Sequence, residues 1–261
     1  MEEPKPPELH TDEPHTELLT KPRMSLLARL LNVFAVPGEV FAELKRAPAA
    51  ASNWLVPALL GAVIGVLSAL IILSQPAVQQ QFRERQNKIV EERAKTKALT
   101  PQEQKIMEWL KSPSVLKTLG SAAAVAGSFG NVLWWGCALW FLARILFRVR
   151  VPFSKTIEAA GLAMMINVLG GIVALVLIVN LGHAGATASL ALLVKDFDAA
   201  RKGNLFAVTA NVFSIWVVGV RSIGLAKLTG VPYLRAAWAV FTFWLLEQSL
   251  LILMGAGKLG M

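Results

Sequence analysis

The amino-acid sequence predicts an all-α protein, a polytopic bundle of five transmembrane helices with a helical insertion outside the membrane. Of its 261 residues, 55% are hydrophobic and 16% are charged, whereas ordinary soluble domains contain about 25% charged residues. The mean hydropathy is +0.54. Five long apolar stretches follow one another, and none shows the sustained alternation of a membrane β-barrel. These observations argue against a soluble enzyme.

Residues 1–23 are expected to form a disordered acidic tail. Residues 1–22 contain six acidic and two basic side chains together with several prolines, and few apolar residues. The rest of the chain carries 24 bases and 11 acids, so the net charge of +9 combines an acidic tail with a basic body. Because that body is apolar, we expect anionic lipid headgroups, and not nucleic acid, as its partner.

Residues 24–53 are expected to form short amphipathic helices at the membrane interface. Apolar residues follow helical spacing from Leu26 to Phe34, Pro37-Gly38 interrupts the pattern, and a second short apolar face follows. Neither piece is long enough to span a bilayer. They can lie at the interface, pack on the end of the bundle, or do both. The bases expected to contact headgroups, here and after the second span, are Arg29, Lys45, Arg46, Arg144, Arg148 and Arg150.

The first span begins at a tryptophan, Trp54, and carries Gly61 and Gly65 at the GxxxG spacing typical of helix contacts. The second is longer than a hydrocarbon core of about 30 Å requires, so we expect it to tilt or to project. Residues 188–202 resemble a further helix at the surface. Within a membrane domain covering 54–254, the expected spans are 54–73, 118–147, 157–181, 205–225 and 236–254.

The polar insertion, residues 75–117, contains nine bases and five acids. Thr100 to Glu103 reads Thr-Pro-Gln-Glu, a capping box with proline at the first helical position. We therefore expect a long polar helix and a short amphipathic one. Since acids and bases are interleaved and no aromatic series accompanies them, a solvated helical face is favoured over a nucleic-acid site.

An odd number of spans places the two ends of the chain on opposite sides of the membrane. Bases in the short connections favour a cytoplasmic N-terminus, although the insertion argues the other way. Because the bases of the insertion alternate with acids in a folded segment, we give them less weight.

Four polar side chains inside the expected spans form a candidate intramembrane layer, and they are Asn131, Asn167, Ser214 and Glu247. One interpretation is that they hydrogen-bond between helices and hold the bundle together. The other is an ion or proton path through Glu247, which would make the protein a small-solute or ion-coupled transporter. Arg221, near the inner end of its span, is expected to extend to the headgroups and not to pair with Glu247.

No catalytic, cofactor-binding or metal-binding residue is predicted. His183 has no further ligand at zinc spacing, and Cys137 lies in an apolar run typical of a buried small side chain. The chain contains neither HExxH nor GxSxG, and no glycine-rich phosphate loop. We therefore expect a protein that is not an enzyme and that needs no cofactor.

Three patterns resemble the Yip domain, the five-span module of the Ypt/Rab-interacting membrane proteins. The first combines a short helix, Pro-Gly-Glu and Phe with a tryptophan and a proline at the entrance of span one. The second precedes span three, and the third is a tryptophan followed by Gly-Leu in span four. The residues that carry them are Leu31 to Phe41, Trp54, Pro57, Pro152-Phe153, Lys155 to Ile157, Phe213 to Trp216, Gly224-Leu225 and Gly230.

This resemblance implies a non-enzymatic polytopic protein that acts as an adaptor or organiser in membrane trafficking or homeostasis. It implies a cytoplasmic N-terminus and leaves room for a membrane-protein partner or a homo-oligomer. Trafficking relatives carry an Asp-Leu-Tyr-Gly-Pro tract before the spans, whereas the only tyrosine here is Tyr233. The sequence is more similar to the prokaryotic branch of the family, which implies a bacterial plasma membrane.

Overall fold

The computed structural model describes residues 24–76, 78–80, 84, 87, 100–110, 112–181 and 211–254. Five of its helices are long and apolar enough to cross a membrane. The predicted fold class, an all-helical membrane bundle, is therefore confirmed. The elements are α1 (Leu26–Ala35), α2 (Pro37–Arg46), α3 (Ser52–Ile72), α5 (Pro101–Leu110), α6 (Pro113–Phe141) continued by the π-helical η2 (Leu142–Leu146), α7 (Phe153–Leu181), α9 (Val212–Thr229) and α10 (Tyr233–Leu253).

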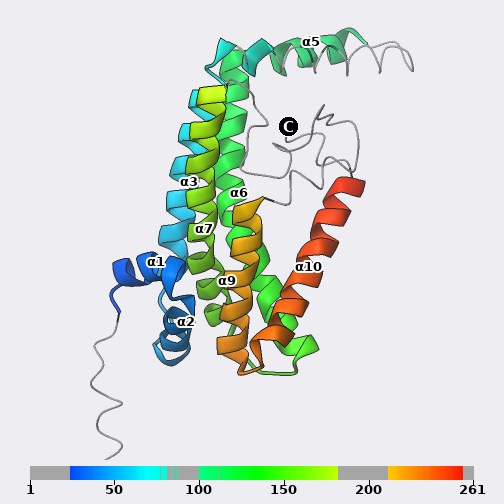
Figure 1. The fold of residues 1–261 in the computed structure, drawn as a ribbon. Helices are drawn as coiled ribbons and strands as arrows, with labels where there is room; N and C mark the ends of the chain where they lie inside the picture. Colours follow the sequence, from blue (N-terminus) through cyan, green and yellow to red (C-terminus); the bar gives the residue numbers. More distant parts are fainter. Residues whose placement is uncertain are drawn as a thin grey trace, which may run out of the picture.

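The five long helices run alternately up and down, as Figure 1 shows. Helices α1 and α2 lie at one end of the bundle, here called the lower end, and α5 lies at the opposite, upper end. Helix α3 packs against both α6 and α7, α7 packs against α9, and α9 packs against α10. The upper half of α10 leans away from α9 in the view of Figure 1.

Local sequence signals explain several helix ends. The hydroxyl of Ser25 accepts a hydrogen bond from the backbone N–H of Ala28 at 3.2 Å and caps α1. Pro37 opens α2 at a position where a missing N–H costs nothing. Before α5, Thr100 Oγ1 accepts from the Glu103 N–H at 3.3 Å, and a Glu103 carboxylate oxygen accepts from the Thr100 N–H at 2.8 Å. The capping box predicted from the sequence is present.

The fourth span differs from its expected range of 205–225. The carboxamide oxygen of Asn211 accepts a hydrogen bond from the Ser214 N–H at 2.7 Å, so α9 begins at Val212. It ends at Thr229, because Gly230 adopts a left-handed conformation with φ of 80°. The capping residues determine both ends of α9. The expected range was based on hydropathy, which does not detect helix caps. The acidic tail, the expected surface helix 188–202 and most of the polar insertion lie outside the described residues.

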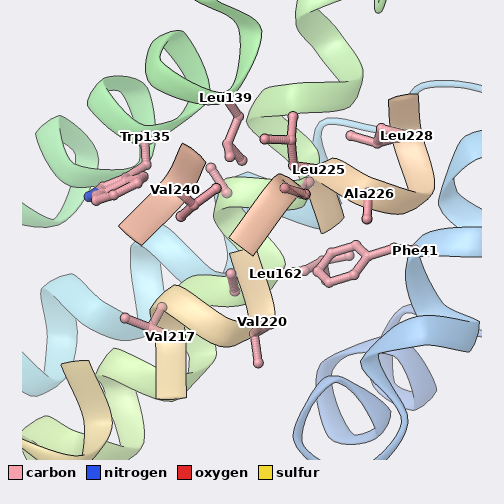
Figure 2. Packing of buried hydrophobic residues seen from close by; sticks show 14 of the residues in the cluster. Phe41, Trp135, Leu139, Leu162, Val217, Val220, Leu225, Ala226, Leu228 and Val240 are labelled. Atoms are coloured by element: carbon pink, nitrogen blue, oxygen red, sulfur yellow. The ribbon is translucent and has the colours of Figure 1, made fainter. Parts of the chain in front are cut away.

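Helices α1 and α2 pack on the lower end of the bundle through their apolar faces. Val33, Val40, Phe41 and Leu44 are completely buried. Figure 2 shows Phe41 extending from α2 toward Leu162 of α7 and Ala226 of α9. Of the two compatible interpretations of residues 24–53, packing on the bundle is thus observed. On the other side of α1, Leu27 and Leu31 remain 65% and 60% exposed, as expected of an interfacial helix.

Glycines allow α3 to approach its neighbours closely. A Cβ atom added to Gly65 would lie 2.9 Å from the Cβ of Ala124 on α6. A Cβ added to Gly161 of α7 would collide with the backbone of Trp54 at the start of α3. Since backbone cannot rotate away as a side chain can, glycine at position 161 is what lets α3 and α7 cross there.

Candidate functional site

A buried arginine lies inside the bundle, where α6, α9 and α10 meet. Arg221 of α9 is only 3% exposed, and its guanidinium carbon lies 3.9 Å from the centroid of the Trp135 ring on α6. Its Nη2 donates a hydrogen bond of 3.2 Å to the carboxamide oxygen of Asn131, also on α6. The aromatic face and the amide together replace part of the hydration that the cation loses on burial.

Glu247 of α10 supplies the opposite charge to this cluster. Its half-buried carboxyl group is close enough to feel the charge of Arg221, but the two form no ion pair within 4 Å. We refer to Asn131, Trp135, Arg221 and Glu247 as the arginine cluster. The cluster connects three membrane spans, of which α10 otherwise packs mainly against α9.

One expectation about Arg221 proves wrong, because its side chain is buried and does not extend to the headgroups. In agreement with the other expectation, Arg221 and Glu247 form no ion pair within 4 Å. The reason for the burial lies in the direction of α9, since side chains lean toward the N-terminus of their own helix. Helix α9 runs downward (Figure 1), so the Arg221 side chain leans upward, away from the lower end and toward Asn131 and Trp135.

The other members of the expected polar layer are distributed over two cavities. The first, of about 400 Å³, lies between α3, α6 and α7 and is lined by Asn131 and Asn167, among others. The second, of about 200 Å³, lies between α7 and the start of α9 and is lined by Asn167, Asn211 and Ser214. Asn131 thus lies against Arg221 and in the first cavity, Asn167 lines both cavities, and Ser214 lines the second. A functional role of these residues as one layer stays a prediction.

A second buried network, which was not predicted from the sequence, lies at the lower end. Arg29 of α1 donates to a carboxylate oxygen of Glu43 on α2 at 2.8 Å and to the carboxamide oxygen of Asn53 on α3 at 3.2 Å. Asn53 in turn donates to Glu158 of α7 at 2.6 Å, and Glu158 pairs with Lys155 at 3.3 Å. The two cations and two anions of this lower network balance, which suits a buried site.

Arg29 is therefore 9% exposed and held inside the protein, and not at the surface where a headgroup contact was expected. The sequence contains a signal for this position. Arg29 falls between Leu26, Leu30 and Val33 on one face of the α1 helix, which is the face that packs on the bundle. A charge on an apolar face indicates a buried partner, and Glu43 and Asn53 supply it.

Comparison with known proteins then identifies the family. The model of the Yip1 domain matches residues 31–255, which is most of the chain. The chain belongs to the Yip1 family. The comparisons with curated proteins and with solved structures give no match. The resemblance inferred from the sequence patterns is confirmed, and the protein is a multi-pass integral membrane protein of a family that is generally non-enzymatic.

The matched Yip1 range begins inside α1 and ends just beyond α10. Helices α1 and α2 are thus part of the Yip1 domain together with the five spans. This agrees with the lower network, which joins α1 and α2 to α3 and α7. Among the described residues, no group of three or more His, Cys, Asp or Glu side chains is arranged to hold a metal ion.

The remaining predicted headgroup contacts of this Yip1 protein are exposed at or near its lower end. They are Lys45, Arg46, Arg144, Arg148 and Arg150. The Arg144 guanidinium lies 5.9 Å from the centroid of the Trp140 ring. Arg148 follows η2 in a left-handed conformation, with φ of 56°, and turns the chain toward α7. Their binding to lipid phosphates stays a prediction.

Proposed function

We propose that this Yip1-family protein is a non-enzymatic adaptor or organiser of the membrane, acting in membrane trafficking or homeostasis. The observation that supports it most directly is that the buried charged side chains contact other parts of the protein. Arg29, Lys155, Glu158 and Arg221 each interact with side chains of neighbouring helices or of their own helix turn. A catalytic group must instead be presented to a substrate. The buried charges here stabilise contacts within and between helices.

A test combines purification with transport measurements. The full-length protein is expected to retain a defined membrane-protein partner, or a second copy of itself, when purified in mild detergent. Reconstituted alone into proteoliposomes, it is expected to carry no solute, because the arginine cluster serves as a structural link between spans. Uptake clearly above that of protein-free liposomes would contradict the proposal, and so would a monomer that purifies free of partners.

One observation favours a second candidate function, a small-solute or ion-coupled transporter. Asn131 lines the larger cavity and hydrogen-bonds Arg221, which is electrostatically coupled to Glu247. A solute in that cavity would thus be separated by one residue, Asn131, from the intramembrane charge of Arg221. Under this alternative, Glu247→Gln abolishes uptake while the protein still folds, and the exposed Glu39→Gln leaves uptake unchanged. Equal uptake by wild type and Glu247→Gln, or none by wild type, excludes it.

We also propose a bacterial plasma membrane with the lower end in the cytoplasm. Cytoplasmic flanks of membrane spans carry an excess of Lys and Arg. The described exposed bases at the lower end are Lys45, Arg46, Arg144, Arg148, Arg150, Lys227 and Arg235. The only exposed acid described in that region is Glu39. This arrangement supports a cytoplasmic N-terminus, and with five spans the end of α10 would then lie on the opposite side of the membrane.

A further inference from the structure

The larger cavity, called the slot below, is an open cavity along three helices in the membrane-spanning part of the protein. Its walls are Gly61 to Ile72 on α3, Ala124 to Asn131 on α6 and Met164 to Ile178 on α7. At the helical rise, the α7 wall is about 21 Å long. The volume of about 400 Å³ falls within the range of small-molecule sites. It is too small for a partner helix, which is about 10 Å wide with its side chains.

Small residues keep the slot open. Gly127 of α6 lies on its wall, and a Cβ atom added there would meet no heavy atom within 4 Å. Gly61 and Gly65 instead lie where α3 touches its neighbours. The glycines of α3 thus hold the helices together, while Gly127 leaves room between them. The rest of the wall is largely aliphatic, with Ile64, Val168, Leu175 and Ile178 among its members.

The lower part of the slot is lined by carboxamides whose N–H donors are available. The carboxamide oxygen of Asn131 accepts from Arg221. Since a guanidinium only donates, this fixes the orientation of the amide and leaves its NH₂ group free. Within the described part of the chain neither that NH₂ nor the side chain of Asn167 makes a hydrogen bond. Unpaired amides are costly in hydrocarbon, so a ligand atom or water is needed there.

The charge behind these amides determines which kind of atom fits. Arg221 lies immediately behind Asn131, and its own Nε has no hydrogen-bond partner. A cation on one side of an amide strengthens the N–H donors on the other. Ser128, the other polar group at this level, already donates its hydroxyl proton to the Ala58 carbonyl oxygen at 2.6 Å. The free NH₂ of Asn131 is thus a donor next to a cation that the same amide contacts directly, and Asn167 can turn its own NH₂ toward the same point. This arrangement favours an accepting oxygen in the ligand, above all a carboxylate.

We propose that the slot binds a monoacyl amphiphile, with a fatty acid as the simplest member of the class. Its carboxylate or carbonyl oxygen accepts hydrogen bonds from Asn131 and Asn167. Its hydrocarbon chain follows the α7 wall toward Ile178 at the upper end. The oxygen of this ligand provides the missing hydrogen-bond partner of the amides, and its hydrocarbon chain packs against the aliphatic wall. The proposal does not rest on an adaptor role.

The test is photolabelling of the full-length protein in detergent by palmitic acid that carries a diazirine in its chain. We expect saturable labelling that unlabelled palmitate displaces, with the modified residues between 168 and 178. A hexadecane probe with the same diazirine and no carboxyl group is expected to label at least about tenfold less, since a hydrogen bond to a charged group contributes about 1.5–3 kcal/mol.

Two leucine substitutions on the same helix provide a matched comparison. Gly127→Leu fills the slot and is expected to abolish saturable labelling. Gly130→Leu adds the same side chain at a position that is equally open but does not line the slot, and it should label like wild type. Asn167→Leu should reduce labelling by the acid to the level of the hydrocarbon probe. If Gly127→Leu does not fold, Ala174→Leu fills the slot from α7.

Three results would overturn the proposal. They are undiminished labelling of a folded, slot-filled variant, equal labelling by the hydrocarbon probe, and modification confined to the lipid-facing side chains of α10. None of them bears on whether a protein partner co-purifies, so the proposed function is judged separately.

Discussion

At the scale of single residues, the buried charges of this Yip1 protein stabilise the fold only in combination. Glu158 is 1% exposed and faces both Asn53 and Lys155. Removing one partner of such a pair leaves the other buried without compensation, which costs far more than the pair contributes. Within the spans, the buried Arg221 likewise depends on its neighbours Asn131 and Trp135.

Glu158→Leu is therefore expected to lower the free energy of unfolding by about 3–5 kcal/mol, because Lys155 then remains as an uncompensated buried cation. Thermal unfolding in detergent would show this as a decrease in Tm. The double variant Lys155→Met/Glu158→Leu should recover much of the loss, since both charges are gone. The exposed Glu39→Gln serves as control. A double variant no more stable than Glu158→Leu would show that the ion pair is not the cause.

The arginine cluster leads to a second prediction, a coupling between two spans. Arg221→Met and Glu247→Gln are each expected to destabilise the protein, and the double variant should be more stable than the sum of the two effects implies. Groups in one interaction network show coupling energies of about 0.5–3 kcal/mol. We expect a value at the lower end, because Arg221 and Glu247 form no ion pair within 4 Å. A double-mutant cycle of unfolding measurements yields the value, and strict additivity would mean that the two side chains act independently.

The arginine cluster also shows the limit of residue-scale prediction. The sequence alone indicates that Glu247 lies inside a span and therefore needs a polar partner. It does not indicate that Arg221 is buried against Asn131 and Trp135, because that contact depends on how α6 and α9 pack. A depth counted from the helix ends also omits the lean of the arginine side chain toward the N-terminus of α9.

At the scale of helices, the composition of the sequence predicts that a span is present better than it predicts the residues at which the span begins and ends. All five spans can be predicted from hydropathy. A span needs about 20 consecutive apolar residues to cross a bilayer, and few other structures contain so long an apolar run. The ends of α9 follow from Asn211 and Gly230, whose capping roles depend on backbone conformation. Contacts between helices are harder to predict. Gly161 carried no GxxxG signal in the sequence analysis, yet it forms the tightest approach of α7 to α3.

Gly161→Ala should thus destabilise the crossing of α3 and α7. The added methyl group would collide with the backbone of Trp54 and with the neighbouring Asn53 carbonyl, so one helix must shift. Overpacking of this kind typically costs about 1–3 kcal/mol, measured again as a decrease in Tm. Gly219→Ala on α9 is the matched control, since its Cβ meets nothing within 4 Å and alanine favours the helix. Equal Tm values for the two variants would contradict the packing described here.

At the scale of the whole molecule, the arrangement of charge fixes the expected orientation in the membrane. The lower end presents Lys45, Arg46, Arg148 and Arg150 to solvent, and it is where α3 begins, η2 ends and α7 begins. The upper end carries the short helix α5, in which Glu103, Lys105 and Glu108 mix both signs. An excess of bases close to the span ends determines orientation, while a mixed-sign folded segment contributes little.

Cysteine labelling in intact cells tests this orientation. With Cys137 replaced by serine, single cysteines are introduced as Pro152→Cys and Arg235→Cys at the lower end and as Glu108→Cys at the upper end. All three positions are exposed or lie on exposed helices. A membrane-impermeant maleimide should label only Glu108→Cys, and the other two should react after the cells are permeabilised. Labelling of Pro152→Cys and Arg235→Cys without permeabilisation would reverse the orientation. Labelling of only one of them would contradict the five-span fold, because an even number of spans, α7 and α9, separates the two positions.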